Sequence, residues 1–140
     1  MSEIHRIFIE EFDHLEPLLW MNWAIEDRFG LNIFDQPFPE KGWATYSNKQ
    51  VDLLVYRCEI DDAEKNVAVN EFMGLQDFAI ENQNQTNQRK RGKLYQEFKE
   101  SIVLPSSLVD TICDSVYFKY FYPPEHVEAA RKRWSVPSST

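Results

Sequence analysis

The pattern of apolar and polar positions predicts a helical amino-terminal region. From Glu3 to Phe29, apolar residues recur at the three- and four-residue spacing of an amphipathic helix. Pro17 lies inside this stretch and has no backbone N–H to donate, so we expect two helices, or one helix with a kink. Gly30 follows directly and suits the left-handed residue that ends many helices.

Strands are expected in the segment that follows. The run VDLLVYR at 51–57 is apolar, too short for a helix and without polar alternation, which predicts a central buried strand covered on both faces. Before it, prolines and a glycine separate short pieces, and we expect further strands at 32–34 and 43–46. In open α/β sheets, ligands bind beyond the carboxyl ends of such strands, which makes the charged end of this run a candidate rim of a site.

A capped helix is predicted after the central strand. Asp61 or Asp62 can accept hydrogen bonds from the free N–H groups of a first helical turn, and Gly74 suits the end of that helix. The apolar residues expected on its buried face are Val67, Val69, Phe72 and Met73. The sequence therefore predicts a strand, a short turn and a helix in this order.

The carboxyl-terminal part of the chain has a helical pattern that prolines interrupt. The predicted helices cover residues 94–103, 107–121 and 125–134. Ser106 or Ser107 is expected to cap the second of them. The third has an acid in its first turn and basic residues near its end, as the helix dipole favours. Residues 135–140 are expected to form a frayed tail.

Together, these elements predict a single α/β domain over residues 1–134. The expected fold is rich in helices and has a small, partly parallel sheet around the strand at 51–57. The chain has 140 residues, of which 43% are hydrophobic and 14% aromatic. That content is sufficient for one hydrophobic core and excludes the composition of a disordered protein.

Charge and cysteine content restrict the classes of function. The formal net charge is -8, which argues against a general nucleic-acid-binding protein because phosphate neutralisation requires clustered Lys and Arg. Cys58 and Cys113 are far apart and form no ligand spacing with the histidines, so we expect free thiols and no metal site. No apolar stretch approaches the roughly 18 residues of a membrane span, and the amino terminus lacks a signal-peptide pattern. We therefore expect a cytoplasmic protein without a membrane span.

Loose motifs spread from Trp20 to Trp134 carry a resemblance to a known family. They include WMNWAIEDRFG, VDLLVYRCEID, NEFMGL, IVLPSSLVDTICDSVYFKYFYPPEH and the closing RKRW. In order and spacing, they resemble the carboxyl-terminal half of the sulfotransferase-like proteins of the capsular polysaccharide synthesis family. The resemblance implies a P-loop-like α/β fold. In full-length members it implies transfer of sulfate from phosphoadenosine phosphosulfate to a sugar hydroxyl.

The chain departs from this pattern at the donor site. The resemblance implies a glycine-containing strand-to-helix loop that holds the donor's phosphates, but the four glycines here are isolated. We therefore expect a domain that is at most part of a sulfotransferase and inactive alone. No cofactor is expected unless a missing amino-terminal half or another chain supplies the donor site. The alternative is a non-catalytic protein-binding or regulatory module on the same scaffold.

A basic run supplies the candidate anion-binding residues. They are Arg89, Lys90, Arg91 and Lys93, with Tyr95 close by. These residues could bind a phosphate or sulfate, and related sulfotransferases place a basic loop over the donor. The alternative is an exposed loop whose charge offsets the acidic surface.

Arg57 and Glu59 end the predicted central strand and are candidates for the rim of a site. The alternative is structural, with the acid capping the next helix or ordering a loop. No catalytic residue can be singled out, because the histidines lack paired spacing and no Ser, His and Asp order stands out.

The aromatic side chains are the other unusual feature, and most are expected in the core. The candidates for an interaction surface are Trp20, Trp23, Tyr120, Phe121 and Tyr122. An exposed aromatic patch could contact a partner protein or a second copy of the chain, or could stack on a saccharide.

Overall fold

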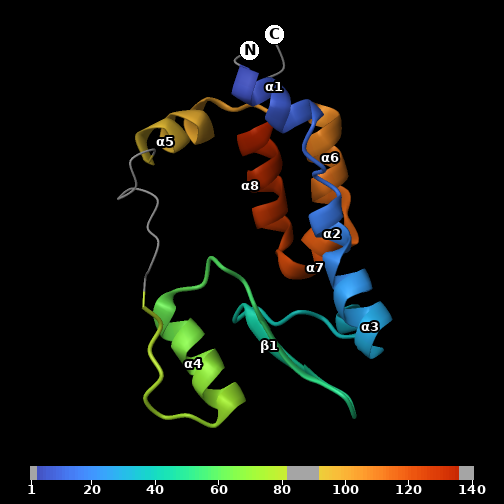
Figure 1. Ribbon diagram of the computed structural model, residues 1–140, viewed down its shortest axis with the longest axis vertical. Coiled ribbons are helices and arrows are strands. Elements are labelled where there is room, and N and C mark those ends of the chain that lie inside the picture. Colours follow the sequence, from blue (N-terminus) through green and yellow to red (C-terminus); the bar gives the residue numbers. More distant parts are fainter. Residues whose placement is uncertain (1–2, 82–91, 136–140) are drawn as a thin grey trace.

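The fold is rich in helices and contains one small sheet. The structure, a computed structural model, describes residues 3–81 and 92–135. Its helices and helical turns are α1 (Glu3–Glu10), α2 (Glu16–Met21), the π-helical turn η1 (Asn22–Glu26), α3 (Asp27–Phe29), the 3-10 turn η2 (Ile33–Asp35), α4 (Asp62–Met73), α5 (Gly92–Ser101), α6 (Ser106–Asp114), α7 (Val116–Phe121) and α8 (Pro124–Trp134). The strands are β1 (Trp43–Ser47) and β2 (Asp52–Tyr56). In Figure 1, α6 and α8 lie at one end of the molecule, and the strands and α4 lie at the other.

The sheet is antiparallel, so the prediction of a partly parallel sheet is wrong. Its two strands pair along their whole length. Asn48 closes the turn between them, because its side-chain oxygen accepts hydrogen bonds from the N–H groups of Gln50 (2.8 Å) and Val51 (3.1 Å). A connection this short joins antiparallel strands, whereas parallel strands need a long crossover. The isolated parallel bridge between Leu104 and Ser135 lies outside the sheet.

β2 is not a central strand, because the sheet has only two strands, and it is only partly buried, with Val55 as its one buried residue. On one face, Tyr46 and Val55 belong to the main core. On the other, Trp43 is 4% exposed and its indole N–H donates to Glu64 of α4 at 3.4 Å. Tyr56, at the end of β2, is 38% exposed.

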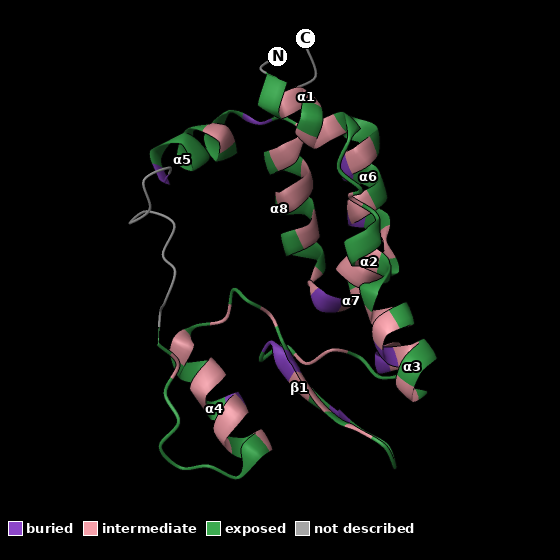
Figure 2. Ribbon diagram, in the orientation of Figure 1, coloured by how far each residue is buried: buried purple, intermediate pink, exposed green. Residues whose placement is uncertain are grey.

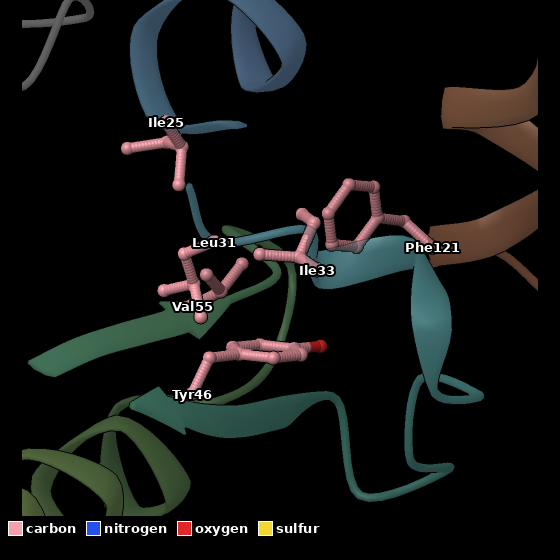
Figure 3. Packing of buried hydrophobic residues seen from close by; sticks show 6 residues of the cluster. All are labelled: Ile25, Leu31, Ile33, Tyr46, Val55 and Phe121. Carbon is pink, nitrogen blue, oxygen red and sulfur yellow. The ribbon is translucent and has the colours of Figure 1, made fainter. Parts of the chain in front are cut away.

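The main core lies between the sheet, the chain from η1 to η2, and α7. Its buried residues, drawn in Figure 3, are Ile25, Leu31, Ile33, Tyr46, Val55 and Phe121. Tyr120 of α7 donates a hydrogen bond to the carbonyl oxygen of Ile33, and its hydroxyl lies 2.7 Å from that of Tyr46. These contacts fasten α7 to β1 and η2. Figure 2 shows that buried positions elsewhere form only small patches on largely exposed helices.

The predicted ends of two helices are confirmed. Gly30 and Gly74 have φ angles of 63° and 65°, in the left-handed region that favours glycine. Asp61 caps α4, since its side-chain oxygen accepts a hydrogen bond from the N–H of Glu64 at 2.7 Å. All three features depend on residues close together in sequence.

A 3-10 turn, η2, replaces the strand predicted at 32–34. The side-chain oxygen of Asn32 accepts a hydrogen bond from the N–H of Phe34 at 2.9 Å. This local bond competes with strand pairing and bends the chain into the turn.

The predicted helix at 107–121 is two helices, because Ser115 interrupts it. Ser115 is extended, with φ -61° and ψ 150°, and its hydroxyl accepts a hydrogen bond from the N–H of Phe118 at 3.1 Å. Ser115 thus ends α6 and caps α7. Pro105 occupies the cap position of α6 and makes no side-chain cap bond, so neither of the two predicted serines caps that helix.

The predicted buried face of α4 is confirmed only in part. Val69 and Phe72 are half-buried, whereas Val67 and Met73 are 44% and 59% exposed. Ala68, which was not among the predicted residues, is fully buried. Apolar spacing therefore identified half of the residues on the buried side of the helix.

Candidate functional site

The charged end of β2 leads into a groove between residues 37–40 and the start of α8. Two adjoining hollows of about 640 and 460 Å³ share three lining residues, Arg57, Tyr122 and His126. Phe38 and Glu40 also line the first hollow. We call the surface formed by both hollows the Arg57 groove.

Arg57 is held in place by backbone contacts. Its N–H donates to the carbonyl oxygen of Gly42 at 2.9 Å, and its Nη2 donates to the carbonyl oxygen of Glu40 at 3.1 Å. Its Nε is buried and has no hydrogen-bond partner among the described residues. Nε is shielded from solvent, so an anionic group that enters the groove would have to bind the terminal N–H groups of the guanidinium.

Gly42 makes room for the Arg57 side chain. Its φ angle is 85°, in a region that side-chain-bearing residues rarely adopt. A Cβ at this position would overlap Ile60 and would lie 2.9 Å from Nη2 and 3.0 Å from Nε of Arg57. Both conformation and packing therefore require glycine here.

Tyr122 and Glu59 meet in the second hollow although 63 residues separate them. The Tyr122 hydroxyl donates to a carboxylate oxygen of Glu59 at 2.9 Å. Burial, together with this hydrogen bond, raises the pKa of Tyr122 well above its ordinary value. The ring of Phe118 stacks on that of Tyr122, with centroids 4.7 Å apart. Rings and polar groups thus lie side by side.

The groove brings together residues that the sequence suggested separately. Arg57 and Glu59 are the predicted rim residues, and Tyr122 is one of the predicted aromatic surface residues. The sequence pointed to neither Glu40 nor His126, because an isolated acid and an isolated histidine carry no spacing signal. The fold alone places them beside Arg57.

Two other predicted aromatic surface residues contribute mainly to the core. Phe121 is 5% exposed, and its ring lies edge-on to that of Phe38 with centroids 4.9 Å apart. The hydroxyl of Tyr120 is bonded to Ile33. Their rings therefore support the wall of the Arg57 groove rather than form an open surface.

Trp20 and Trp23 are exposed, as the interaction hypothesis requires. They are 44% and 48% exposed, and their rings contact each other edge-on with centroids 6.3 Å apart. Neither lines the Arg57 groove. Their binding role stays a prediction.

Most of the predicted anion-binding run lies outside the described residues, namely Arg89, Lys90 and Arg91. Lys93 is in α5, where its side chain is 92% exposed and 3.9 Å from Glu97. Tyr95 is 52% exposed. Within residues 3–81 and 92–135, no group of His, Cys, Asp and Glu side chains could hold a metal ion.

The family relationship rests on a comparison with family models. Residues 1–123 match the family described as putative capsular polysaccharide synthesis protein. The chain belongs to this family. No curated protein and no solved structure matches the chain. In this member of the capsular polysaccharide synthesis family, none of the helices in the described ranges is long and apolar enough to cross a membrane.

Proposed function

We propose that the chain acts in capsular polysaccharide synthesis by binding an acidic saccharide in the Arg57 groove, as the acceptor-binding part of a sulfotransferase-like enzyme. Membership of the family supports the process. The observation that carries the proposal is Arg57, which lines both hollows of a groove with aromatic and carboxylate neighbours.

An acidic saccharide is complementary to Arg57 and to the aromatic part of a groove that also contains the carboxylates of Glu40, Glu59 and Glu125. Its carboxylate or sulfate accepts hydrogen bonds from the planar guanidinium of Arg57. Its hydroxyls can donate to Glu59 and to the phenolic oxygen of Tyr122, whose own proton is donated to Glu59, while the apolar faces of its rings pack against aromatic side chains. Glu59 and Tyr122 already form a hydrogen bond with each other, so they are polar groups held in fixed positions.

The turn between β2 and α4 lacks the glycines of a usual site for the phosphates of phosphoadenosine phosphosulfate. Residues 57–61, between β2 and α4, contain no glycine, and Lys93 is exposed beside Glu97. Backbone N–H groups at such a strand-to-helix turn usually bind donor phosphates. We therefore propose that sulfate transfer depends on a donor site contributed by other residues or by another chain.

Calorimetric titration with two disaccharides of equal length tests the acceptor site. A disaccharide containing a uronic acid should bind at least about tenfold more tightly than a neutral one, because a hydrogen bond to a charged group is worth about 1.5–3 kcal/mol. Arg57→Gln should remove this preference. Arg28→Gln, which removes the same charge from the exposed surface of α3, should leave it unchanged. Equal affinity for both sugars in the unaltered protein would contradict the proposal.

A second titration separates acceptor binding from donor binding. Adenosine bisphosphate, the product of the donor, is titrated into the same protein. Heat that charge reversal at Arg89 and Arg91 abolishes would show that this chain contacts the donor. Absence of heat at millimolar adenosine bisphosphate would show that the chain does not bind the donor and would leave acceptor binding as its role.

The exposed face of α2 and η1 favours a second candidate function, a non-catalytic module that binds a second copy of this chain. Leu15, Leu19 and Trp23 follow one another at four-residue spacing and are 44%, 59% and 48% exposed. These three side chains form a ridge, and a hollow of about 430 Å³ lies beside Leu19. In a symmetric dimer, the ridge of each copy could then pack into the hollow of the other. Light scattering should then show a dimer that Trp23→Ser dissociates, and a monomeric unaltered protein would exclude this candidate.

A further inference from the structure

A second pocket lies between α1, α5, α6 and α8. It shares three lining residues, Phe118, Ala130 and Trp134, with the second hollow of the Arg57 groove. It has a volume of about 450 Å³, within the usual range of small-molecule sites. Figure 1 shows these four helices at the same end of the molecule. We call this cavity the α5 pocket.

The interior of the α5 pocket is apolar. Ile102, Val109 and Cys113 line it and are 4%, 2% and 2% exposed. Phe98 adds an aromatic ring that contacts Phe8 of α1, with centroids 5.4 Å apart. Apolar cavities bind water poorly because water finds few partners there, and they accept hydrocarbons instead.

The lining of the α5 pocket is basic, although carboxylates of α6 lie close to it. Lys99 lines the pocket, and no Asp or Glu does so. Asp110 and Asp114, next to the lining, are ion-paired with Arg131. No ion pair joins the ammonium group of Lys99 to a carboxylate within the described part of the chain, and Arg133 donates a hydrogen bond from Nη2 to the carbonyl oxygen of Lys99 at 3.4 Å. In a chain of net charge -8, a lining that contains a lysine and no acid favours an anionic group at that lysine.

We propose that the α5 pocket binds a medium-chain fatty acid, with the aliphatic chain among Ile102, Val109 and Cys113 and the carboxylate at Lys99. An apolar cavity of about 150 Å³ accommodates benzene, so a pocket three times larger has room for about ten carbons. The open side, where Tyr95 is 52% exposed, provides entry. This proposal does not rest on the proposed saccharide site, although the two sites share one wall, and it goes beyond it.

Displacement of a fluorescent fatty acid, dansylaminoundecanoic acid, from the full chain tests the ligand class. Octanoate, decanoate and dodecanoate compete below their micellar concentrations, and affinity should rise about fourfold per methylene. Decyltrimethylammonium, with the opposite charge, should compete at least about tenfold less well than decanoate. An affinity that does not depend on chain length, or equal competition by the cationic compound, would overturn the proposal.

Two variants and one chemical probe test the location. Lys99→Glu should weaken decanoate binding at least about tenfold, whereas Lys132→Glu, the same charge change at an exposed position of α8, should change it less than about twofold. In a Cys58→Ser background, saturating decanoate should slow the reaction of Cys113 with methyl methanethiosulfonate at least about fivefold. Unprotected Cys113, or equal effects of the two lysine changes, would place the fatty acid elsewhere and refute the site.

Discussion

The hydrogen-bonded chain from Tyr46 through Tyr120 to Ile33 predicts an asymmetric response to mutation. The hydroxyl of Tyr120 donates its single proton to the carbonyl oxygen of Ile33. Tyr46 must therefore be the donor in its 2.7 Å contact with Tyr120. The two tyrosines have different roles, although both contribute one hydroxyl to the same core.

The magnitudes follow from which groups lose a partner. Tyr46→Phe removes one hydrogen bond and leaves Tyr120 bonded to Ile33, so it should cost about 1 kcal/mol of unfolding free energy. Tyr120→Phe removes both bonds and leaves the carbonyl of Ile33 and the hydroxyl of Tyr46 without partners, which should cost about 2–3 kcal/mol. The double variant should cost about 2 kcal/mol, clearly less than the sum, because the unpaired Tyr46 hydroxyl is gone.

Urea unfolding followed by tryptophan fluorescence at neutral pH provides the measurement. Tyr56→Phe is the matched control, because Tyr56 is 38% exposed and should change stability by less than about 0.5 kcal/mol. An equal or larger cost for Tyr46→Phe would refute the direction of donation. Additive costs within about 0.3 kcal/mol would refute the coupling.

Three further predictions concern the groove, the junction of α6 with α7, and pH. Gly42→Ala should lower the unfolding free energy measured in urea by about 1–3 kcal/mol, because a Cβ there displaces Arg57. For the same reason it should weaken binding of the uronic-acid disaccharide in calorimetry, and unchanged values of both quantities would refute the packing argument. Ser115→Ala should lower the unfolding free energy by about 1 kcal/mol, because α7 loses its cap. Ser106→Ala, at an exposed position, should lower it by less than about 0.5 kcal/mol, and equal losses would contradict the capping role of Ser115. Burial, aided by a hydrogen bond to a neighbour, raises the pKa of Tyr46 and of Tyr122. In the unfolded chain these phenols lose their protons from about pH 10, while in the folded chain they keep them. The unfolding free energy should therefore be constant below about pH 10 and fall above it, and it should fall less steeply in Tyr46→Phe. A flat profile would contradict the burial of the two phenols.

Local signals in the sequence predicted the parts of the fold that depend on neighbouring residues. The cap at Asp61 and the left-handed Gly30 and Gly74 need only a few adjacent residues to form. The arrangement of the sheet was harder to predict. Nothing in the run at 51–57 shows whether a tight turn or a long crossover joins it to the strand with which it pairs. The turn at Asn48 makes the two strands antiparallel, and this turn is not among the elements predicted from the sequence.

The candidate site was predictable only in fragments. The charge pattern at the end of β2 drew attention to Arg57 and Glu59, and the aromatic run at α7 drew attention to Tyr122. That Glu59 and Tyr122 form a hydrogen bond depends on the path of the chain between them, because they are 63 positions apart in sequence. His126 joins them because Pro123 and Pro124 start α8 at the edge of the groove, and proline positions predict a helix start but not what lies opposite it.

The two proposed sites are connected through one wall. Phe118, Ala130 and Trp134 line both the second hollow of the Arg57 groove and the α5 pocket. Phe118 is the third residue of α7 and its N–H donates to the Ser115 hydroxyl, so the break between α6 and α7 helps to fix this wall. We expect a continuous helix over 107–121 to direct the ring of Phe118 differently and to change the lining of both the second hollow and the α5 pocket. The serine that interrupts the predicted helix therefore contributes to the shape of both proposed sites.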